Sequence, residues 1–107
     1  MGLNAEYAKI EPSRLELDAL DEPCVVEFST AWCGHCMAAQ PLIAEAFDGY
    51  PQVRHFKIED GPGRRLGRSF RVKLWPTLVF MRHGKEVARV VRPQSVTEIE
   101  KAFASFA

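Results

Sequence analysis

The sequence lacks any run of about 20 apolar residues that could span a bilayer. Its first twenty residues also lack the basic start and the apolar core that define a secretory signal peptide. Cysteine is scarce, because the chain has three, an odd number and too few for the disulfide scaffold of a small secreted domain. These absences predict a cytoplasmic protein that associates with no membrane.

The length and composition predict one compact domain over residues 1–107. Domains usually contain about 100 to 200 residues, so this chain has no room for a second. With 47% apolar and 26% charged residues, its composition is typical of a globular protein. A domain of this size buries roughly 65% of the surface of its unfolded chain, so it can fold without a structural metal or disulfide. The cysteines are therefore available for chemistry.

The formal net charge is zero, but the charges are unevenly placed along the chain. Residues 1–22 hold six acidic and two basic side chains, whereas residues 61–92 hold nine basic and one acidic. A basic cluster of this kind is ordinarily a solvated face, and the alternative is a surface that steers an acidic partner. No recognition motif accompanies the basic residues, so we expect no nucleic-acid binding.

Hydrophobic periodicity predicts alternating helices and strands in the first 70 residues. A capping box at Ser13 and Glu16 predicts a short helix that ends near Pro23. The other predicted segments are a buried strand at 24–29, a helix at 34–48, a strand at 53–58 and a short basic helix at 64–70. The strand at 24–29 contains one charged residue, Glu27, which is unusual for a buried strand.

The last third of the chain predicts a hairpin and a terminal helix. Strand-like runs at 77–81 and 86–91 flank His83-Gly84, a pair that favours a tight antiparallel turn. A second capping box, which begins at Ser95, opens the terminal helix. Strands joined first through helices and then through a hairpin indicate an α/β fold with a mixed central sheet and helices on both faces.

The segment Trp32-Cys33-Gly34-His35-Cys36 is the strongest candidate for a reactive site. It follows a predicted strand and begins a helix, where ligands bind in open α/β folds. The unpaired N–H groups and partial positive charge of a helix N-terminus favour a thiolate, and His35 adds a cation when it is protonated. The i, i+3 spacing brings both sulfurs to one helix face. Cys33 is therefore predicted as the nucleophile and Cys36 as the resolving thiol.

Metal and haem sites fit the sequence less well. A structural zinc site needs four ligands, and His55 and His83 stand alone on a predicted strand and in a predicted turn. Covalent haem needs a histidine directly after Cys36, where this chain has Met37. A metal or iron–sulfur centre shared between two chains and a purely structural role for the cysteines stay open. We expect no metal and no cofactor.

Several motifs together resemble the thioredoxin family over about residues 20–107. These motifs are Val25-Val26-Glu27-Phe28, Ala31-Trp32-Cys33-Gly34-His35-Cys36, Pro41, Trp75-Pro76-Thr77 and His83-Gly84. The resemblance implies a thioredoxin-like fold and a monomeric thiol–disulfide oxidoreductase that acts on protein disulfides and is recycled by an upstream thiol reductase. In that family the proline that matches Pro76 is cis and faces the dithiol, and the backbone there pairs with substrate strands.

The chain departs from the family pattern at two positions of the dithiol region. Gly34-His35 replaces the usual Gly-Pro and resembles the catalytic sequence of protein disulfide isomerases, which implies a more oxidising dithiol and adds isomerase activity as an option. Glu27 stands where the family has a buried aspartate, which implies a catalytic role as proton relay to Cys36. A buried carboxylate without a partner has a raised pKa, which suits proton transfer near pH 7. The alternative is a structural ion pair between Glu27 and Lys57 or His55.

A third departure is Arg92, which stands where the family commonly has a glycine, and Trp75 replaces a smaller residue. Together with Trp32 and His35 they predict an aromatic and cationic rim that takes a narrow set of substrates. The full set of predicted substrate-binding residues is Trp32, Gly34, His35, Trp75, Pro76, Thr77 and Arg92. Simple packing is the alternative for Trp75.

The predicted function is thiol–disulfide exchange with protein substrates through Cys33 and Cys36. The alternative is a thioredoxin-fold adaptor or folding helper that binds one dedicated partner with little redox turnover. Cys24 begins the predicted strand at 24–29. Five strand residues at about 3.3 Å each place it more than about 15 Å from Cys33, and we predict that it is buried and inert.

Overall fold

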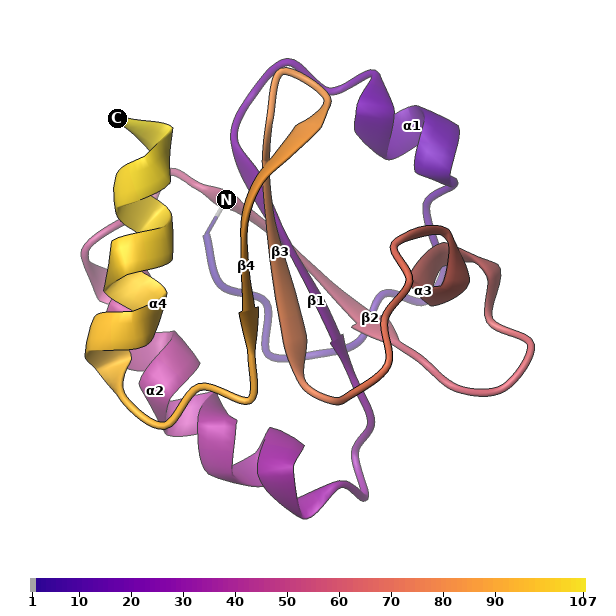
Figure 1. Ribbon diagram of the computed structural model, residues 1–107, viewed down its shortest axis with the longest axis horizontal. Coiled ribbons are helices and arrows are strands. Elements are labelled where there is room, and N and C mark those ends of the chain that lie inside the picture. The colour runs from indigo at the N-terminus through magenta and orange to yellow at the C-terminus, as the bar shows by residue number, and fades with distance from the viewer. Residues whose placement is uncertain (1) are drawn as a thin grey trace.

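A four-stranded mixed sheet forms the centre of the computed structural model, which describes residues 2–107 (Figure 1). The strand order is β2-β1-β3-β4. β1 pairs in parallel with β2 and antiparallel with β3, and β3 pairs antiparallel with β4. The strands are β1 (Cys24–Ser29), β2 (Arg54–Glu59), β3 (Thr77–Arg82) and β4 (Lys85–Val91).

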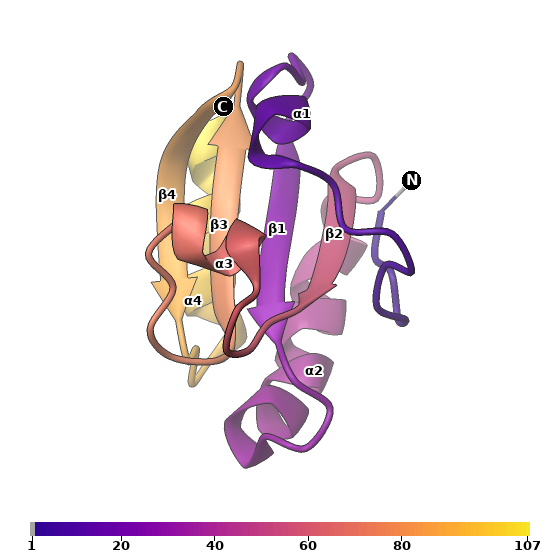
Figure 2. The same cartoon turned by 90° about the vertical axis from the view of Figure 1, so that its right-hand side faces the viewer.

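Helices cover both faces of the sheet, which confirms the predicted α/β architecture. The helical segments are α1 (Arg14–Asp18), α2 (Gly34–Asp48), α3 (Arg65–Ser69), α4 (Val96–Phe103) and the 3₁₀ turn η1 (Ala104–Phe106). In Figure 2, α1 and α3 lie in front of the sheet and α2 and α4 lie behind it. None of the helices in residues 2–107 is long and apolar enough to cross a membrane.

The local signals in the sequence act as predicted. Both capping boxes form, so the side chains of Ser13 and Ser95 each accept a hydrogen bond from the backbone three residues further on. At the β3–β4 turn, His83 and Gly84 both have positive φ, 52° and 74°, as a two-residue type I′ hairpin turn requires. The predicted segments match the observed ones to within one or two residues at their ends, except that α1 ends at Asp18 and not near Pro23 as predicted. Its C-cap is Ala19, whose backbone N–H donates to the Leu15 carbonyl.

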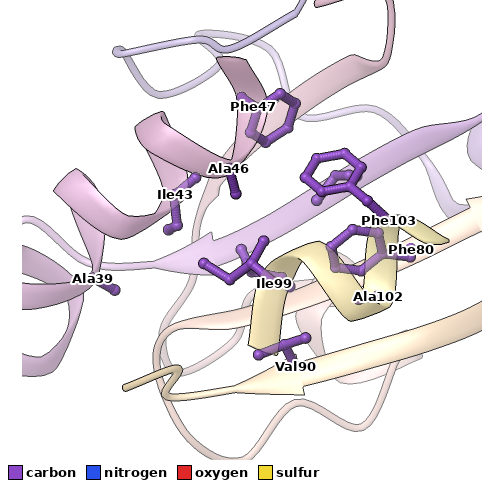
Figure 3. Close-up of a cluster of buried hydrophobic side chains, with 11 residues drawn as sticks. Ala39, Ile43, Ala46, Phe47, Phe80, Val90, Ile99, Ala102 and Phe103 are labelled. Carbon is purple, nitrogen blue, oxygen red and sulfur yellow. The ribbon is translucent and has the colours of Figure 1, made fainter. Parts of the chain in front are cut away.

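A separate hydrophobic cluster lies on each face of the sheet. Figure 3 shows the cluster under α2 and α4, where Phe103 contacts Phe47 and Phe80 edge to face at ring-centroid distances of 5.0 and 5.1 Å. The second cluster packs α1 and α3 onto the opposite face through Leu17 and Phe70, among other side chains. β1 is buried at all six positions because both clusters cover it.

The strand register brings four chain segments to one edge of the sheet. Ser29, the last residue of β1, is level with Glu59, the last residue of β2. Thr77, the first residue of β3, is level with Phe28 on one side and Val91 on the other. The loop into α2, the loop after β2, the loop into β3 and the end of β4 therefore meet at this edge.

Candidate active site at the carboxyl end of β1

Cys33 is the N-cap residue of α2, one position before the predicted first turn. Burial raises the pKa of its thiol, but hydrogen bonds outweigh that effect. They come from the backbone N–H and the thiol of Cys36 and from the backbone N–H of His35, and the charge of Arg92 acts in the same direction. The pKa of Cys33 is therefore below that of an ordinary cysteine, which confirms the predicted effect of the helix N-terminus.

Cys36 has the opposite electrostatic environment. Burial raises the pKa of its thiol to about 12, and the Cys33 sulfur and the Glu27 carboxylate act in the same direction. A hydrogen bond from the backbone N–H of Thr30 opposes these effects without cancelling them. The two thiols therefore differ in acidity, and Cys33 loses its proton at a lower pH than Cys36.

The rim contains two tryptophans and an arginine that contact one another. Trp32 is 74% exposed, and its ring meets Trp75 edge to face at 5.7 Å. The indole N–H of Trp75 donates to the Asp60 carboxylate at 2.9 Å. The carbonyl of Trp75 accepts from Arg92 Nε at 2.9 Å and contacts the Cys33 sulfur at 3.9 Å. Trp75 therefore has four partners beside the dithiol, which are Trp32, Asp60, Arg92 and Cys33.

The loop before β3 has the shape that the resemblance implies, with a cis peptide bond between Trp75 and Pro76. The backbone N–H of Arg92 donates to the Pro76 carbonyl at 2.9 Å, and Arg92 has a φ of 48°. That left-handed conformation explains why glycine suits this position. Thr77 is 1% exposed and its hydroxyl donates to the Leu74 carbonyl at 2.6 Å, so its side chain supports the loop from within.

Glu27 is fully buried, but it is not an unpartnered carboxylate. Its Oε1 lies 2.9 Å from Nε2 of His55, and its Oε2 accepts from Gln40 Nε2 at 2.9 Å and from the Ser29 hydroxyl at 3.1 Å. Burial alone would raise the pKa of Glu27, but the bonds from His55 and Gln40 and the charge of Lys57 lower it. The expectation of a raised pKa was wrong because it assumed no partner.

Of the two partners named in the structural alternative, His55 contacts Glu27 directly, as a hydrogen-bond partner. The backbone N–H of Asn4 donates to Nδ1 of His55 at 2.8 Å, so Nδ1 is an acceptor and the ring proton sits on Nε2, facing Glu27. Lys57 acts from one step further away, because its Nζ donates to Gln40 Oε1 at 3.1 Å and to the Ala5 carbonyl at 3.2 Å.

The segment of residues 2–8, which runs beside β2, supplies part of this network (Figure 2). The Tyr7 hydroxyl lies 3.0 Å from the Ser29 hydroxyl, and the backbone N–H of Ala8 donates to the Lys57 carbonyl at 2.8 Å. A hollow of about 260 Å³ opens next to this segment, with Cys36 and Gln40 among its lining residues.

Several residues of the site were not predicted from the sequence. Gln40 lies one helical turn after Cys36, and that i, i+4 spacing is a signal that could have found it. Asp60 and Asn4 belong to irregular segments, and only the tertiary structure brings them to Trp75 and His55.

Cys24, the third cysteine, lies away from the dithiol. Cys24 begins β1 at the opposite edge of the sheet, and burial raises the pKa of its thiol to about 11, so it is buried and unreactive, as predicted. All three cysteines are free. Within residues 2–107 no three His, Cys, Asp or Glu side chains gather closely enough to hold a metal ion.

A comparison with known proteins gives consistent matches. The family model described as Thioredoxin matches residues 11–105. Thioredoxin-1 of Saccharomyces cerevisiae is 36% identical over 73 residues, which cover 68% of this chain and 71% of the yeast protein. The matched segment spans 58% of the H-type thioredoxin of Fagopyrum esculentum, which is 30% identical over 67 residues. The reduced form of thioredoxin 2 from Pseudomonas aeruginosa PAO1 superposes with a TM-score of 0.85 at 63% identity, covering 96% of this chain and 95% of that one.

Proposed function

Because the chain belongs to the thioredoxin family of thiol–disulfide oxidoreductases, we propose that it exchanges disulfides with protein substrates through Cys33 and Cys36. The opposite pKa shifts of the two thiols are the observation that carries this proposal. The pKa of the Cys33 thiol is lowered, which favours its thiolate, and the Cys36 thiol is held protonated with a pKa of about 12.

The reaction transfers two electrons from the dithiol to the substrate. The Cys33 thiolate attacks one sulfur of the substrate disulfide, so a mixed disulfide forms and the first substrate thiolate leaves. Cys36 then loses its proton and attacks the Cys33 sulfur. The second substrate thiolate leaves, and Cys33 and Cys36 end as a disulfide while the substrate is reduced.

Formation of the mixed disulfide itself activates Cys36. Two of the effects that raise its pKa come from the Cys33 sulfur, as a hydrogen-bond partner and as a negative charge. Both disappear when Cys33 is bonded to the substrate, while the hydrogen bond from the Thr30 N–H stays. Cys36 therefore becomes easier to deprotonate at the step that needs its thiolate.

We assign the proton of Cys36 to Glu27 at this step. The lowered pKa keeps the Glu27 carboxylate ionised, so an unprotonated acceptor is present, but it also makes Glu27 a weaker base than an unpartnered buried carboxylate. Gln40 joins the two groups, because its Nε2 donates to Glu27 at 2.9 Å and to the Cys36 carbonyl at 3.2 Å. The hollow lined by Cys36 and Gln40, about 260 Å³, is large enough to hold a water beside the Cys36 thiol, and Gln40 separates it from Glu27.

The rim binds the substrate around the attacked disulfide. Trp32, Gly34 and His35 are exposed on the α2 side. Trp75, Pro76 and Arg92 stand on the opposite side, with Thr77 holding their loop from behind. Because of Gly34-His35, the proposal includes isomerase activity. A Cys33 thiolate of lowered pKa leaves more readily from a mixed disulfide, so the substrate can be released with a rearranged disulfide.

We also propose that the chain acts in the cytoplasm, as a single-domain monomer that an upstream thiol reductase recycles. An odd number of cysteines that is too small for a disulfide scaffold is typical of a protein in a reducing compartment. Each cycle leaves Cys33 and Cys36 oxidised, so a donor of two electrons is needed before the next.

Turnover of insulin disulfides with dithiothreitol as the electron donor tests the proposal. The chain should accelerate insulin precipitation, and Cys33→Ser should abolish the acceleration. Cys36→Ser should instead accumulate mixed disulfides with protein substrates, because the resolving thiol is gone. Insulin that precipitates no faster than with dithiothreitol alone, together with partner binding that survives Cys33→Ser, would assign the chain to the adaptor class.

A further inference from the structure

We propose that the exposed cations of α3 and of the segment leading into β3 form a second part of the substrate site, which selects disulfide proteins with acidic residues beside the reactive disulfide. We name this set, Arg65, Arg68, Arg71 and Lys73, the α3 cationic surface. The inference deepens the proposed function and rests on it.

Among the described residues, the four cations form no salt bridge that would give them a role in stabilising the fold. All four are exposed, and within residues 2–107 none of them has a carboxylate within 4.0 Å. Neighbouring cations differ, because Arg64 pairs with Glu59 at 3.2 Å and Arg89 pairs with Glu86 at 2.7 Å. The positive charge of the α3 cationic surface is therefore available to a partner.

Contacts connect this surface to the dithiol. A hollow of about 310 Å³ is lined by Arg68, Arg71 and Lys73, together with Asp60 and other residues of the loop after β2. The Asp60 carboxylate also accepts from the Trp75 indole, and the Trp75 carbonyl contacts the Cys33 sulfur. Trp75 thus lies between Cys33 and the hollow in a continuous chain of contacts.

Exposed apolar side chains belong to the same edge of the sheet. Leu74 is 47% exposed and precedes Trp75 in the chain, and Val91 is 42% exposed and level with Thr77. Trp32 is 74% exposed and contacts Trp75. Apolar side chains and cations therefore both border the Trp75 loop, which fits a peptide segment with apolar and acidic residues near its cysteine.

An acidic protein segment fits these observations better than a nucleic acid. The reactive dithiol of this site acts on disulfides, which nucleic acids do not have. Charges at the rim of an interface act mainly on the association rate, so the effect should appear in the rate and weaken with salt.

Three peptides with one intramolecular disulfide and identical apolar residues, flanked by aspartates, asparagines or lysines, test the proposal. The rate constant for their reduction by the reduced chain is followed through tryptophan fluorescence. At about 20 mM salt the aspartate peptide should react on the order of 10-fold faster than the lysine peptide, and at about 0.5 M salt the rates should converge.

A charge-reversed variant and a matched control locate the effect. Arg68→Glu/Lys73→Glu should remove or invert the preference for the aspartate peptide while the iodoacetamide reactivity of Cys33 is retained. Lys85→Glu/Lys101→Glu changes the net charge by the same amount at exposed positions away from this edge, and it should keep the preference. The salt dependence of the unmodified chain provides a test that needs no variant.

The outcomes separate the two proposals. If none of the peptides is reduced, the proposed function fails. If all three are reduced equally fast at low salt, or if the control variant loses the preference as much as the test variant, only the α3 cationic surface is refuted. Binding of a short DNA duplex that Arg68→Glu/Lys73→Glu abolishes, with peptide rates that do not depend on charge, would assign the surface to nucleic acid and overturn the inference.

Discussion

At the scale of single residues, backbone N–H groups contribute as much to the reactivity of Cys33 as side chains do. The N–H groups of Cys36 and His35 both lower the pKa of the Cys33 thiol. The His35 side chain is exposed, and the cation that contributes is Arg92. The role expected for the imidazole therefore belongs in part to the peptide group that carries it.

His35→Pro should raise the pKa of Cys33, because proline has no N–H to donate to the thiolate. The disulfide should become harder to reduce for the same reason. His35→Ala keeps the N–H and should shift the pKa less. The pH dependence of the iodoacetamide reaction gives the pKa of Cys33 in both variants. Equal pKa shifts in the two would show that the imidazole of His35, and not its N–H, lowers the pKa.

Glu27→Gln should destabilise the fold by about 3 kcal/mol, because the glutamine amide faces hydrogen-bond donors on both sides. His55 cannot exchange its proton, since Asn4 donates to its Nδ1. Gln40 cannot turn over, since Lys57 donates to its Oε1. Urea unfolding of the reduced protein near pH 7 measures the loss.

Glu45→Gln is the matched control for this prediction, because Glu45 is exposed on the same helix as Gln40, and it should change stability by less than about 0.5 kcal/mol. Single-turnover kinetics on Glu27→Gln adds the functional readout. Slow release from the mixed disulfide with normal Cys33 alkylation supports the proton-acceptor role. A destabilised variant with normal release would leave Glu27 a structural residue only.

At the scale of elements, α3 affects the rim because it has a glycine, Gly67, where it packs against Asp60. A Cβ on Gly67 would collide with the Asp60 carboxylate, which holds the indole of Trp75. The absence of a side chain at this helical position thus allows the loop after β2 and the loop into β3 to share one hydrogen bond.

Gly67→Ala should displace the Asp60 side chain and release the Trp75 indole while stability changes by less than about 1 kcal/mol. The helix gains about 0.5 to 1 kcal/mol from alanine, and the lost hydrogen bond costs a similar amount. The indole N–H resonance of Trp75, assigned with Trp32→Phe, should move. An unchanged resonance would show that Asp60 accommodates the methyl group without releasing Trp75.

At the scale of the whole molecule, Glu27 makes the free energy of unfolding depend on pH in the acid range. Its pKa is lower in the fold than the value of 4.5 that the unfolded chain has. The unfolded state therefore takes up the proton first as the pH falls. The stabilisation is fully present above about pH 4.5 and is lost as the pH decreases through the lower pKa of the folded state.

The free energy of unfolding should therefore fall more steeply below about pH 4.5 in the natural chain than in Glu27→Gln. The other carboxylates are common to both proteins, so the difference between them isolates Glu27. Urea unfolding at several pH values between about 3 and 7 measures this difference. A difference that stays constant over the whole range would mean that folding does not shift the pKa of Glu27.

The sequence by itself determined the elements, their order and the reactive dithiol. Hydrophobic periodicity, two capping boxes and the His83-Gly84 turn are local features, and each acts over a few neighbouring residues. Cys33 and Cys36 are also close in sequence, so one helix turn defines their geometry. The position of Cys33 at the N-terminus of α2 then predicted that its thiol is the reactive one.

Only the tertiary structure decided the environment of Glu27 and the connection of the rim to α3. His55 and Asn4 reach Glu27 from a neighbouring strand and from the N-terminal segment, and Asp60 reaches Trp75 across two loops. The sign of a buried carboxylate's pKa shift depends on whether such distant partners are present. Sequence spacing does not contain that information, because the partners are brought together by sheet register and packing.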